Sequence, residues 1–462
     1  MLQILRQIRA VARLEPFDTS TAEGRSQERY RRIVFTTASA IAVRAVGVAV
    51  GLVTVPLLLG YLGKEGYGLW TAITTVVSWA TLFDFGLSNG LLNLISRAHG
   101  REDAEEATRL FSTAFLALSA LAIPLALATA VALPWVPWAS LLGARGAMDE
   151  GTVRAGVAVA LGAFIVSLPL GTVSQLYSGY QKTYLTNAFA LLGSVFTLGA
   201  IALAIHLKAP LPLLVLAVSA TGLLPPLLAL GYARKALPWI RVRARHASRA
   251  ALRALTERSV PIFLYQVGAL AVNETQVLIL ARRSGLATVT DYSVATRLYL
   301  VIVSVIQLGT SSFVPPFREA RERGDHAWAL RAFRHLQAVR LGLALAGGAA
   351  LVLLGNPLLK FWLHRGDMAF SWVVWGAYAA LLLAVVWITV YVEFLWIMDR
   401  LWPLVGFVVL NGISTVGITW ALAPSQGVLG AVVASGAFNI LVLTWVLPLI
   451  ARPLLVPDGQ AH

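Results

Sequence analysis

Five long stretches of this chain contain no charged residue: Asp, Glu, Lys and Arg are all absent from 110–144, 155–181, 209–233, 368–392 and 401–451. A helix crosses the hydrocarbon core of a bilayer with about 20 apolar residues, so each stretch is long enough to span a membrane. The whole chain is 58% hydrophobic and 13% charged, whereas soluble domains carry roughly 25% charged residues. The sequence therefore predicts an all-α polytopic membrane protein.

Charged or Pro/Gly-rich turns divide the apolar sequence into twelve candidate spans. The uncharged stretch 401–451 is too long for one helix, and the turn residues 424–427 (PSQG) divide it into two. The expected spans are 33–60, 67–95, 110–134, 155–181, 184–206, 211–233, 259–281, 288–316, 334–356, 368–395, 402–422 and 428–450.

The basic segment 234–258 follows the sixth span and is the expected linker between two halves. We therefore predict two pseudo-symmetric six-helix lobes, 33–233 and 259–451, with a basic N-terminal segment 1–32 and a C-terminal tail 452–462. The segments expected on one side of the membrane carry 26 Lys and Arg residues, and those on the other side carry seven. Because positive residues accumulate on the cytoplasmic side, both termini are expected in the cytoplasm. The formal charge of +15 thus reflects topology, and no nucleic-acid partner is expected.

Several kinds of chemistry are disfavoured by the residues present. The chain has no Cys, and its seven His residues show no i, i+4 pairing, so neither a metal site nor a cofactor is expected. Residues 86–90 (GLSNG) match the G-x-S-x-G pattern of hydrolases, but they end a predicted membrane helix and not a strand. The short predicted loops leave no room for a catalytic domain outside the membrane.

Arg44 lies inside the first predicted span and Arg297 inside the eighth. Arg44 is eleven residues into the first span, which places it about 16 Å deep in a core about 30 Å thick. An arginine there costs at least about 2.5–3.5 kcal/mol, so its side chain should face protein or water. It could bind a phosphate group, form an internal ion pair with Asp84, or extend toward the cytoplasmic surface. Arg297 lies in the eighth span, and the two guanidinium groups together would suit a diphosphate.

Three carboxylates, Asp84, Glu274 and Glu393, also lie within predicted spans, together with polar Asn89 and Asn273. Burial favours the neutral form of a carboxyl group, so such groups can take up and release protons during transport. Each carboxylate could instead pair with an intramembrane arginine or a neighbouring helix. Both interpretations are open at this point.

The sequence also resembles a known family. Residues 55–63 (VPLLLGYLG), 66–70 (GYGLW) and 84–87 (DFGL) are similar to the opening spans of Wzx-type polysaccharide flippases, and residues 291–299 (DYSVATRLY) extend the likeness to the second half. These flippases belong to the multidrug/oligosaccharidyl-lipid/polysaccharide (MOP) exporter superfamily. The resemblance implies a V-shaped pair of six-helix bundles. It also implies that an undecaprenyl-diphosphate-linked oligosaccharide is moved across the bacterial inner membrane by alternating access.

The resemblance implies that Arg44 and Arg297 line a substrate lumen, and that Asp84 lies in a family motif. We add Asn89 and Asn273 as candidate substrate-binding residues, and Asp84 and Glu274 as candidate ion-coupling residues. The expected partners are the lipid-linked oligosaccharide, membrane lipids, a polysaccharide polymerase and a chain-length regulator.

Two alternatives stay open. A cation-coupled multidrug exporter of the same superfamily should present acidic groups to its substrate. A membrane polymerase or O-antigen ligase should carry a large periplasmic loop.

Overall fold

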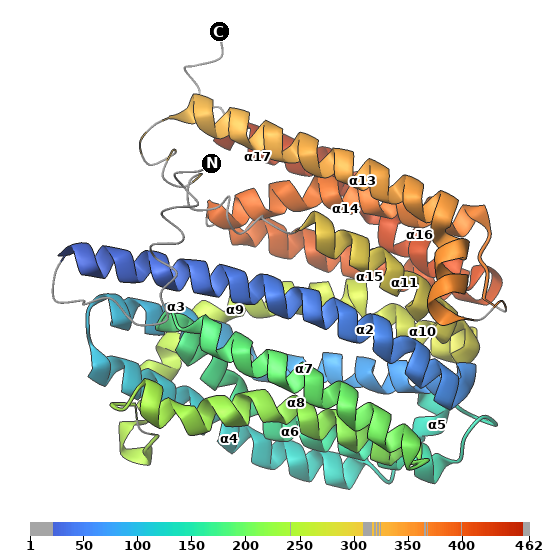
Figure 1. Ribbon diagram of the computed structural model, residues 1–462, viewed down its shortest axis with the longest axis horizontal. Helices are drawn as coiled ribbons and strands as arrows, with labels where there is room; N and C mark the ends of the chain where they lie inside the picture. The colour runs from blue at the N-terminus through green and yellow to red at the C-terminus, as the bar shows by residue number, and fades with distance from the viewer. Residues whose placement is uncertain are drawn as a thin grey trace. The chain divides into compact units, whose positions relative to one another are not determined.

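The computed structural model describes residues 22–240, 242–307, 317, 320, 323, 325–364, 366, 368–398 and 400–455. Residues 1–21 of the predicted basic N-terminal segment and residues 456–462 of the predicted tail lie outside the described residues. Within the described ranges the regular structure is entirely helical (Figure 1). The prediction of an all-α fold is confirmed.

The first long helix holds more than one span. Helix α2 (Ala22–Ala80) has 59 residues, which corresponds to about 88 Å of helix, nearly three times the hydrocarbon core of a bilayer. Its backbone leaves helical geometry at Gly63, where φ is 71° and ψ is 179°. Gly63 tolerates a positive φ because it has no Cβ. The first two spans therefore meet at Gly63.

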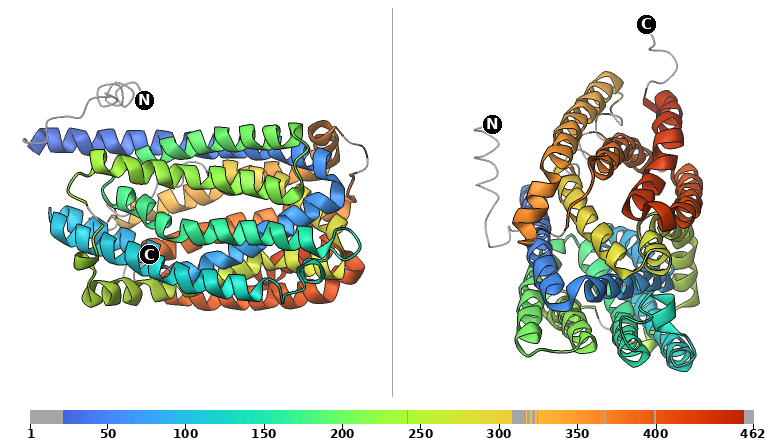
Figure 2. Two further views of the ribbon diagram at one scale, coloured as in Figure 1. Left: turned by 90° about the horizontal axis from the view of Figure 1, so that it is seen from below. Right: turned by 90° about the vertical axis from the view of Figure 1, so that its right-hand side faces the viewer.

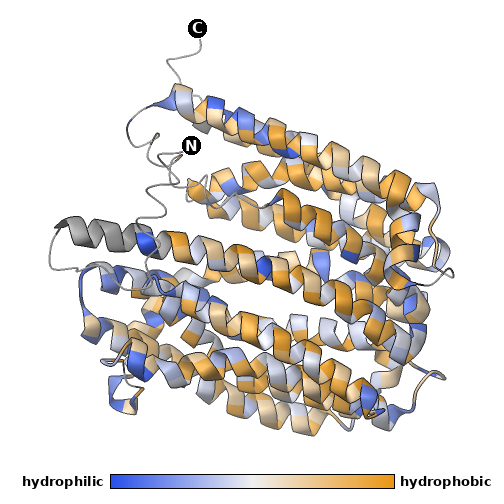
Figure 3. Cartoon of the chain, in the orientation of Figure 1, coloured by the Kyte–Doolittle hydropathy of each residue, from blue (hydrophilic) through white to orange (hydrophobic). Residues whose placement is uncertain are grey.

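Among the described residues, 11 helices are long and apolar enough to cross a membrane, and one of them, Val34–Asp84, contains the turn at Gly63. Counting that helix as two spans confirms the expected number, twelve. Figure 3 shows apolar residues along the lengths of the helices and polar residues mostly near their ends.

The second span continues from α2 through the 3-10 turn η1 (Thr81–Asp84) into α3 (Leu87–Gly100). Spans three to six are α4 (Ala104–Ala132), α6 (Glu150–Gly179), α7 (Thr183–His206) and α8 (Leu211–Ala236), with the short α5 (Trp138–Leu141) between α4 and α6. The 3-10 turn η2 (Ala244–His246) follows α8, and the seventh span consists of α9 (Arg249–Asn273) and α10 (Thr275–Arg283). Spans eight to eleven are α11 (Leu286–Ile306), α13 (His326–Leu363), α14 (Trp372–Ile397) and α15 (Leu401–Gln426). The twelfth span consists of α16 (Val428–Phe438), the π-helical turn η3 (Asn439–Leu443) and α17 (Thr444–Leu455).

The chain divides into two compact units. Unit 1 comprises Met1–Leu57, Ala80–Val136 and Gly151–Ile262, and unit 2 comprises Leu58–Trp79, Pro137–Glu150 and Phe263–His462. Within each unit the axes of the long helices are roughly aligned (Figure 2). Two segments of the N-terminal half, 58–79 and 137–150, thus pack with the C-terminal half. The lobe boundaries 33–233 and 259–451 stay a prediction.

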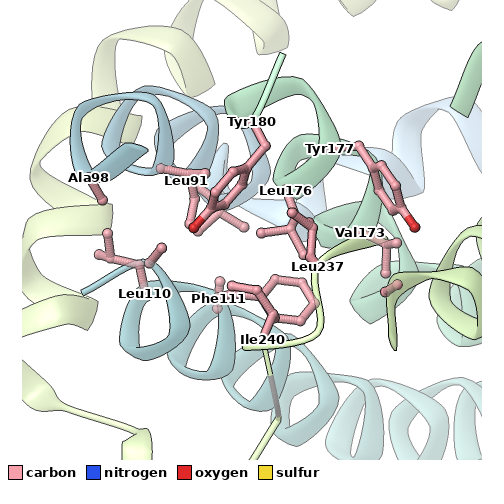
Figure 4. Close-up of a cluster of buried hydrophobic side chains, with 14 of the residues drawn as sticks. Leu91, Ala98, Leu110, Phe111, Val173, Leu176, Tyr177, Tyr180, Leu237 and Ile240 are labelled. Atoms are coloured by element: carbon pink, nitrogen blue, oxygen red, sulfur yellow. The ribbon is translucent and has the colours of Figure 1, made fainter. Parts of the chain in front are cut away.

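The core of unit 1 is an apolar cluster with a few anchored polar groups (Figure 4). Leu91 and Ile95 are fully buried and lie four residues apart, so they share one face of α3. The buried Tyr177 hydroxyl donates a hydrogen bond of 2.8 Å to the carbonyl of Ala229, which satisfies both polar groups and joins α6 to α8. This cluster fixes the positions of α3, α4, α6 and α8.

In unit 2, α13 and α14 pack closely because small residues face aromatic ones. A Cβ at Gly355 would lie 2.4 Å from the Trp375 ring, so no larger residue fits there. At the other end of the pair, Phe333 contacts Tyr391 and Phe394 in edge-on geometry. Such aromatic pairs add stability beyond the apolar area they bury.

Candidate functional site

Three spans are interrupted along their length. The second span breaks between Ala80 and Leu87, the seventh breaks at Glu274, and the twelfth contains the π-helical turn Asn439–Leu443. Broken helices occur inside membranes only where the freed backbone groups find partners in protein or line a cavity. In transporters, such breaks commonly form substrate or ion sites. Three of the six predicted site residues, Asp84, Asn273 and Glu274, lie at the first two breaks.

The break in the second span is stabilised locally. Phe85 and Gly86 both have positive φ, 49° and 73°, so the chain turns sharply before α3 begins. The carboxylate of Asp84 accepts hydrogen bonds from the backbone N–H of Ser88 at 3.3 Å and from its hydroxyl at 2.9 Å. The carbonyl of Gly86 accepts a hydrogen bond of 2.9 Å from the buried hydroxyl of Ser259 on α9. The Asp84 side chain thus accepts a backbone N–H from the first turn of α3, whose N-cap residue is Gly86.

The two hydrogen bonds direct the carboxylate of Asp84 toward the first turn of α3. An ion pair between Asp84 and Arg44 stays a prediction. Asn89 lies half-buried in the first turn of α3. Its role, like coupling through Asp84, stays a prediction.

The break in the seventh span places a carboxylate at the start of a helix. Asn273 is the last residue of α9, its side chain is exposed, and its amide donates a hydrogen bond of 2.7 Å to the carbonyl of Ala269. Glu274 precedes α10, and its carboxylate accepts a hydrogen bond of 3.3 Å from the hydroxyl of the buried Thr75. The hydroxyl of Thr75 in the second span thus holds the Glu274 carboxylate.

A buried polar network continues from this break through unit 2. The side-chain amide of Gln276, which is 1% exposed, donates a hydrogen bond of 2.5 Å to the hydroxyl of Ser435, and its oxygen accepts one from the hydroxyl of Tyr292. The side chain of Asn439, at the π-helical turn, donates to the carbonyl of Ser435 at 2.7 Å and accepts from Asn411 at 3.1 Å. Buried polar groups are strongly favoured to pair in this way.

The sequence patterns did not predict this network. Its members are uncharged and lie on four different helices, α10, α11, α15 and α16, or at the adjoining turn η3. The available signal was the presence of amide side chains inside charge-free spans, such as Asn411 and Asn439 in 401–451. Such amide groups need hydrogen-bond partners inside a membrane, but the sequence does not show which residues supply them.

The two intramembrane arginines occupy different units. Arg44 lies in α2 within unit 1, and its side chain is exposed. Arg297 lies in α11 within unit 2 and is half-buried. Joint capture of one diphosphate by the two guanidinium groups stays a prediction.

The segment after Gly63 contacts the start of the eighth span within unit 2. Lys64 forms an ion pair of 3.4 Å with Asp291, and each side chain is 30% exposed. The Thr290 hydroxyl donates a hydrogen bond of 2.5 Å to the carbonyl of Lys64. A Cβ at Gly68 would lie 2.1 Å from the carbonyl oxygen of Leu286, so only glycine permits this approach. Partly exposed ion pairs contribute about 0–1 kcal/mol, which is weak enough to be broken and remade.

Glu393 has a structural partner. Its carboxylate binds Arg340 through two hydrogen bonds of 3.0 and 3.3 Å, and the Arg340 side chain is 4% exposed. The alternative in which an intramembrane carboxylate pairs with an arginine is therefore confirmed for Glu393. Within the described ranges, no group of three or more His, Asp or Glu side chains is placed to hold a metal ion.

Two sequence comparisons relate the chain to known proteins. Residues 36–320 match the family described as "Polysaccharide biosynthesis protein". A Yersinia pseudotuberculosis protein named "Putative O-antigen export protein" is 36% identical over 85 residues, which is 18% of this chain. That match spans 19% of the length of the curated relative.

Solved structures share the fold over most of the chain. An inward-facing multidrug resistance MATE family transporter of the MOP superfamily superposes with a TM-score of 0.75 at 14% identity, covering 88% of this chain and 94% of that one. A MOP superfamily transporter from Pyrococcus furiosus, reported to have a binding pocket of reverse polarity, superposes with a TM-score of 0.68 at 14% identity over 92% and 95%. The fold is therefore that of MOP transporters.

Proposed function

The chain belongs to the polysaccharide biosynthesis protein family, and on this premise we propose that it moves an undecaprenyl-diphosphate-linked oligosaccharide across a bacterial inner membrane by alternating access. The family and the fold are those of an exporter and not of an enzyme. The oligosaccharide would be a repeat unit of O-antigen or exopolysaccharide. No covalent chemistry is required for this movement.

The observation that carries the proposal is the presence of Arg44 and Arg297 within membrane spans. Moving a bare ion into hydrocarbon costs of order 20 kcal/mol, so a diphosphate needs compensating groups inside the protein. A planar guanidinium binds phosphate oxygens through two parallel hydrogen bonds. A transporter of cationic drugs would need acidic groups at the positions of Arg44 and Arg297.

A reconstituted assay tests this function. Proteoliposomes carrying a fluorescent undecaprenyl-diphosphate oligosaccharide are treated with a membrane-impermeant reductant that destroys accessible fluorophore. With the protein present, we expect nearly all of the fluorescence to be lost, whereas protein-free vesicles should keep the inner-leaflet share. If the oligosaccharide is not moved and a cationic dye is transported, the protein is a multidrug exporter.

Ion coupling gives a separate prediction centred on Glu274. Glu274→Gln keeps a hydrogen-bond acceptor for Thr75 but cannot bind and release a proton. We expect this variant to lose the stimulation of transport by a proton gradient, while the rate without a gradient is retained. The measurement is the initial transport rate in vesicles with and without an imposed gradient.

Asp84→Asn is the comparison for that experiment, because the amide analogue can still accept a hydrogen bond from Ser88. If Asp84→Asn and Glu274→Gln both respond normally to the gradient, neither carboxylate is a coupling site. If only Asp84→Asn loses the response, coupling belongs to the second span and the proposal for Glu274 is wrong.

The orientation of the chain follows from its Lys and Arg distribution. We propose that both termini lie in the cytoplasm. Reporters fused after Arg234 and Arg323 should show cytoplasmic signals, and fusions near Gly146 and Gly366 should show periplasmic signals. Paired alkaline phosphatase and green fluorescent protein fusions measure this directly. Two reversed signals among the four would contradict the proposed topology.

A polysaccharide polymerase and a chain-length regulator are the partners we propose, because an exported repeat unit must be joined to others on the outer leaflet. In-cell crosslinking followed by purification of this chain should recover them. An unrelated membrane protein with the same tag serves as the control. If it recovers the polymerase and the regulator equally well, the association is not specific.

A further inference from the structure

Unit 1 contains a pocket of about 1080 Å³ that none of the transport steps above uses. It lies between α4, α8 and the chain segment that follows α8. Its lining is Phe111, Phe115, Leu227, Leu230, Gly231, Ala233, Arg234, Pro238, Ile240, Val242 and Arg243.

The lining combines a fixed apolar wall with two cations. Phe111 and Ile240 belong to the buried core cluster of unit 1 and lie side by side in Figure 4, so this wall is held by the core. The only charged residues of the lining are Arg234 and Arg243, and both side chains are exposed. Within the described part of the chain, neither forms a recorded ion pair. The pocket therefore offers two guanidinium groups beside an apolar surface, with no carboxylate among its lining residues.

The depth of the pocket is set by α8. Its uncharged stretch 209–233 ends one residue before Arg234, which lies in the last turn of the helix. The apolar side chains therefore lie level with lipid tails, and the guanidinium groups lie level with headgroups. The adjoining segment 234–258 carries eight Lys and Arg residues. Such basic segments beside spans are attracted to the anionic lipids of the cytoplasmic leaflet.

We propose that this pocket binds an anionic phospholipid of the surrounding bilayer. One acyl chain lies along the wall that includes Phe115, Leu227 and Leu230, and the phosphate accepts hydrogen bonds from Arg234 and Arg243. Basic pockets between transmembrane helices bind phospholipid headgroups in this manner. The site lies within unit 1 and does not depend on the substrate that we propose for transport.

The chain offers a variant that fills the pocket without disturbing its neighbours. A Cβ added at Gly231 meets no atom within 4 Å, and Gly231 lines the pocket, so Gly231→Phe should occupy the space of the acyl chain. Gly222 lies on the same helix, is equally exposed and also has no atom within 4 Å of an added Cβ. Because Gly222 is not part of the lining, Gly222→Phe is the matched control.

The probe is a phosphatidylglycerol with a photoactivatable diazirine on one acyl chain, added to the purified full chain in mixed micelles. The labelled peptides are identified by mass spectrometry. We expect labels on 111–115 and 227–243, with strong loss of these labels in Gly231→Phe and normal labelling in Gly222→Phe. Unchanged labelling in Gly231→Phe would overturn the proposal.

A second pair of variants tests the charge requirement and does not alter the shape of the pocket. Each guanidinium near an anionic headgroup should strengthen binding about fivefold, so Arg234→Gln with Arg243→Gln should weaken labelling about 25-fold. The control is Arg245→Gln with Arg249→Gln, which removes two exposed charges outside the lining. If both double variants lose labelling equally, the effect is a general attraction to the basic segment and the proposed site is wrong.

Two competitors identify the occupant. Unlabelled phosphatidylglycerol should displace the probe, whereas phosphatidylcholine should compete only weakly. Equal competition by the two would show an ordinary boundary lipid and overturn the proposal. Stronger competition by undecaprenyl phosphate than by phosphatidylglycerol would overturn the assignment to a bilayer phospholipid and give the site to the prenyl-linked lipids instead.

Discussion

Replacing Arg44 and Arg297 together with alanine should abolish glycan export, while the protein is still made and inserted into the membrane. Both residues lie within spans, and Arg44 is exposed while Arg297 is half-buried, so neither substitution removes a tightly packed core side chain. What the double variant loses is positive charge at the membrane interior, where charge-assisted hydrogen bonds to phosphate are strong. The measurement is surface glycan in cells that depend on this chain, at matched protein level.

Lysine separates charge from geometry in the same experiment. Arg44→Lys and Arg297→Lys keep the positive charge but lose the planar pair of donors, so only partial export is expected. Arg145→Ala serves as the control, because Arg145 is an exposed arginine outside the spans. Normal surface glycan in the Arg44→Ala, Arg297→Ala variant would refute a role for these groups in binding the diphosphate.

Glu393→Gln should lower the free energy of unfolding strongly, because it breaks the ion pair with Arg340. The Arg340 side chain is 4% exposed and the Glu393 side chain is 30% exposed, so losing the carboxylate leaves a buried guanidinium without its counter-ion. Breaking a buried ion pair from one side costs about 3–5 kcal/mol. Arg340→Met should cost less, because the remaining carboxylate has access to solvent. Thermal unfolding of the purified protein in detergent measures both.

Two further variants make that comparison decisive. Combining Arg340→Met with Glu393→Leu should recover much of the stability, because an apolar pair of similar size needs no counter-ion. Glu257→Gln breaks the pair of Arg253 and Glu257, whose side chains are 82% and 62% exposed, and should leave the unfolding temperature unchanged. An equal loss for Glu257→Gln and Glu393→Gln would show that burial is not the cause.

The membrane-spanning architecture follows from the sequence alone. Long charge-free stretches fix where the chain can cross a bilayer, because an unpaired charge in hydrocarbon is costly and about 20 residues suffice for a crossing. The turn at Gly63 confirms the boundary between the first two spans, and η1 and Glu274 lie inside spans that the sequence had located. The presence of Asp84, Glu274 and Glu393 within spans was also readable, since each is a charged residue in an apolar segment.

Tertiary structure decided the partners of two of those carboxylates. Glu274 accepts a hydrogen bond from Thr75 in the second span, and Glu393 pairs with Arg340. The sequence predicted burial with an arginine or a neighbouring helix as partner for each, because hydropathy does not show which way a side chain points. The partner of Asp84 is local, since Ser88 lies four residues along the chain.

Helix breaks depend on partners that are distant in sequence, and this is why only the folded chain located them. The carbonyl of Gly86 accepts a hydrogen bond from Ser259, 173 residues away, in addition to the one from Gly90 in α3. Glu274 is held by Thr75, 199 residues away. The amide network of Gln276, Ser435 and Asn439 likewise joins separate helices. A freed polar group inside a membrane persists only if another segment supplies its hydrogen bond. The sequence therefore determined which segments enter the membrane, whereas packing between segments determined where their helices could break.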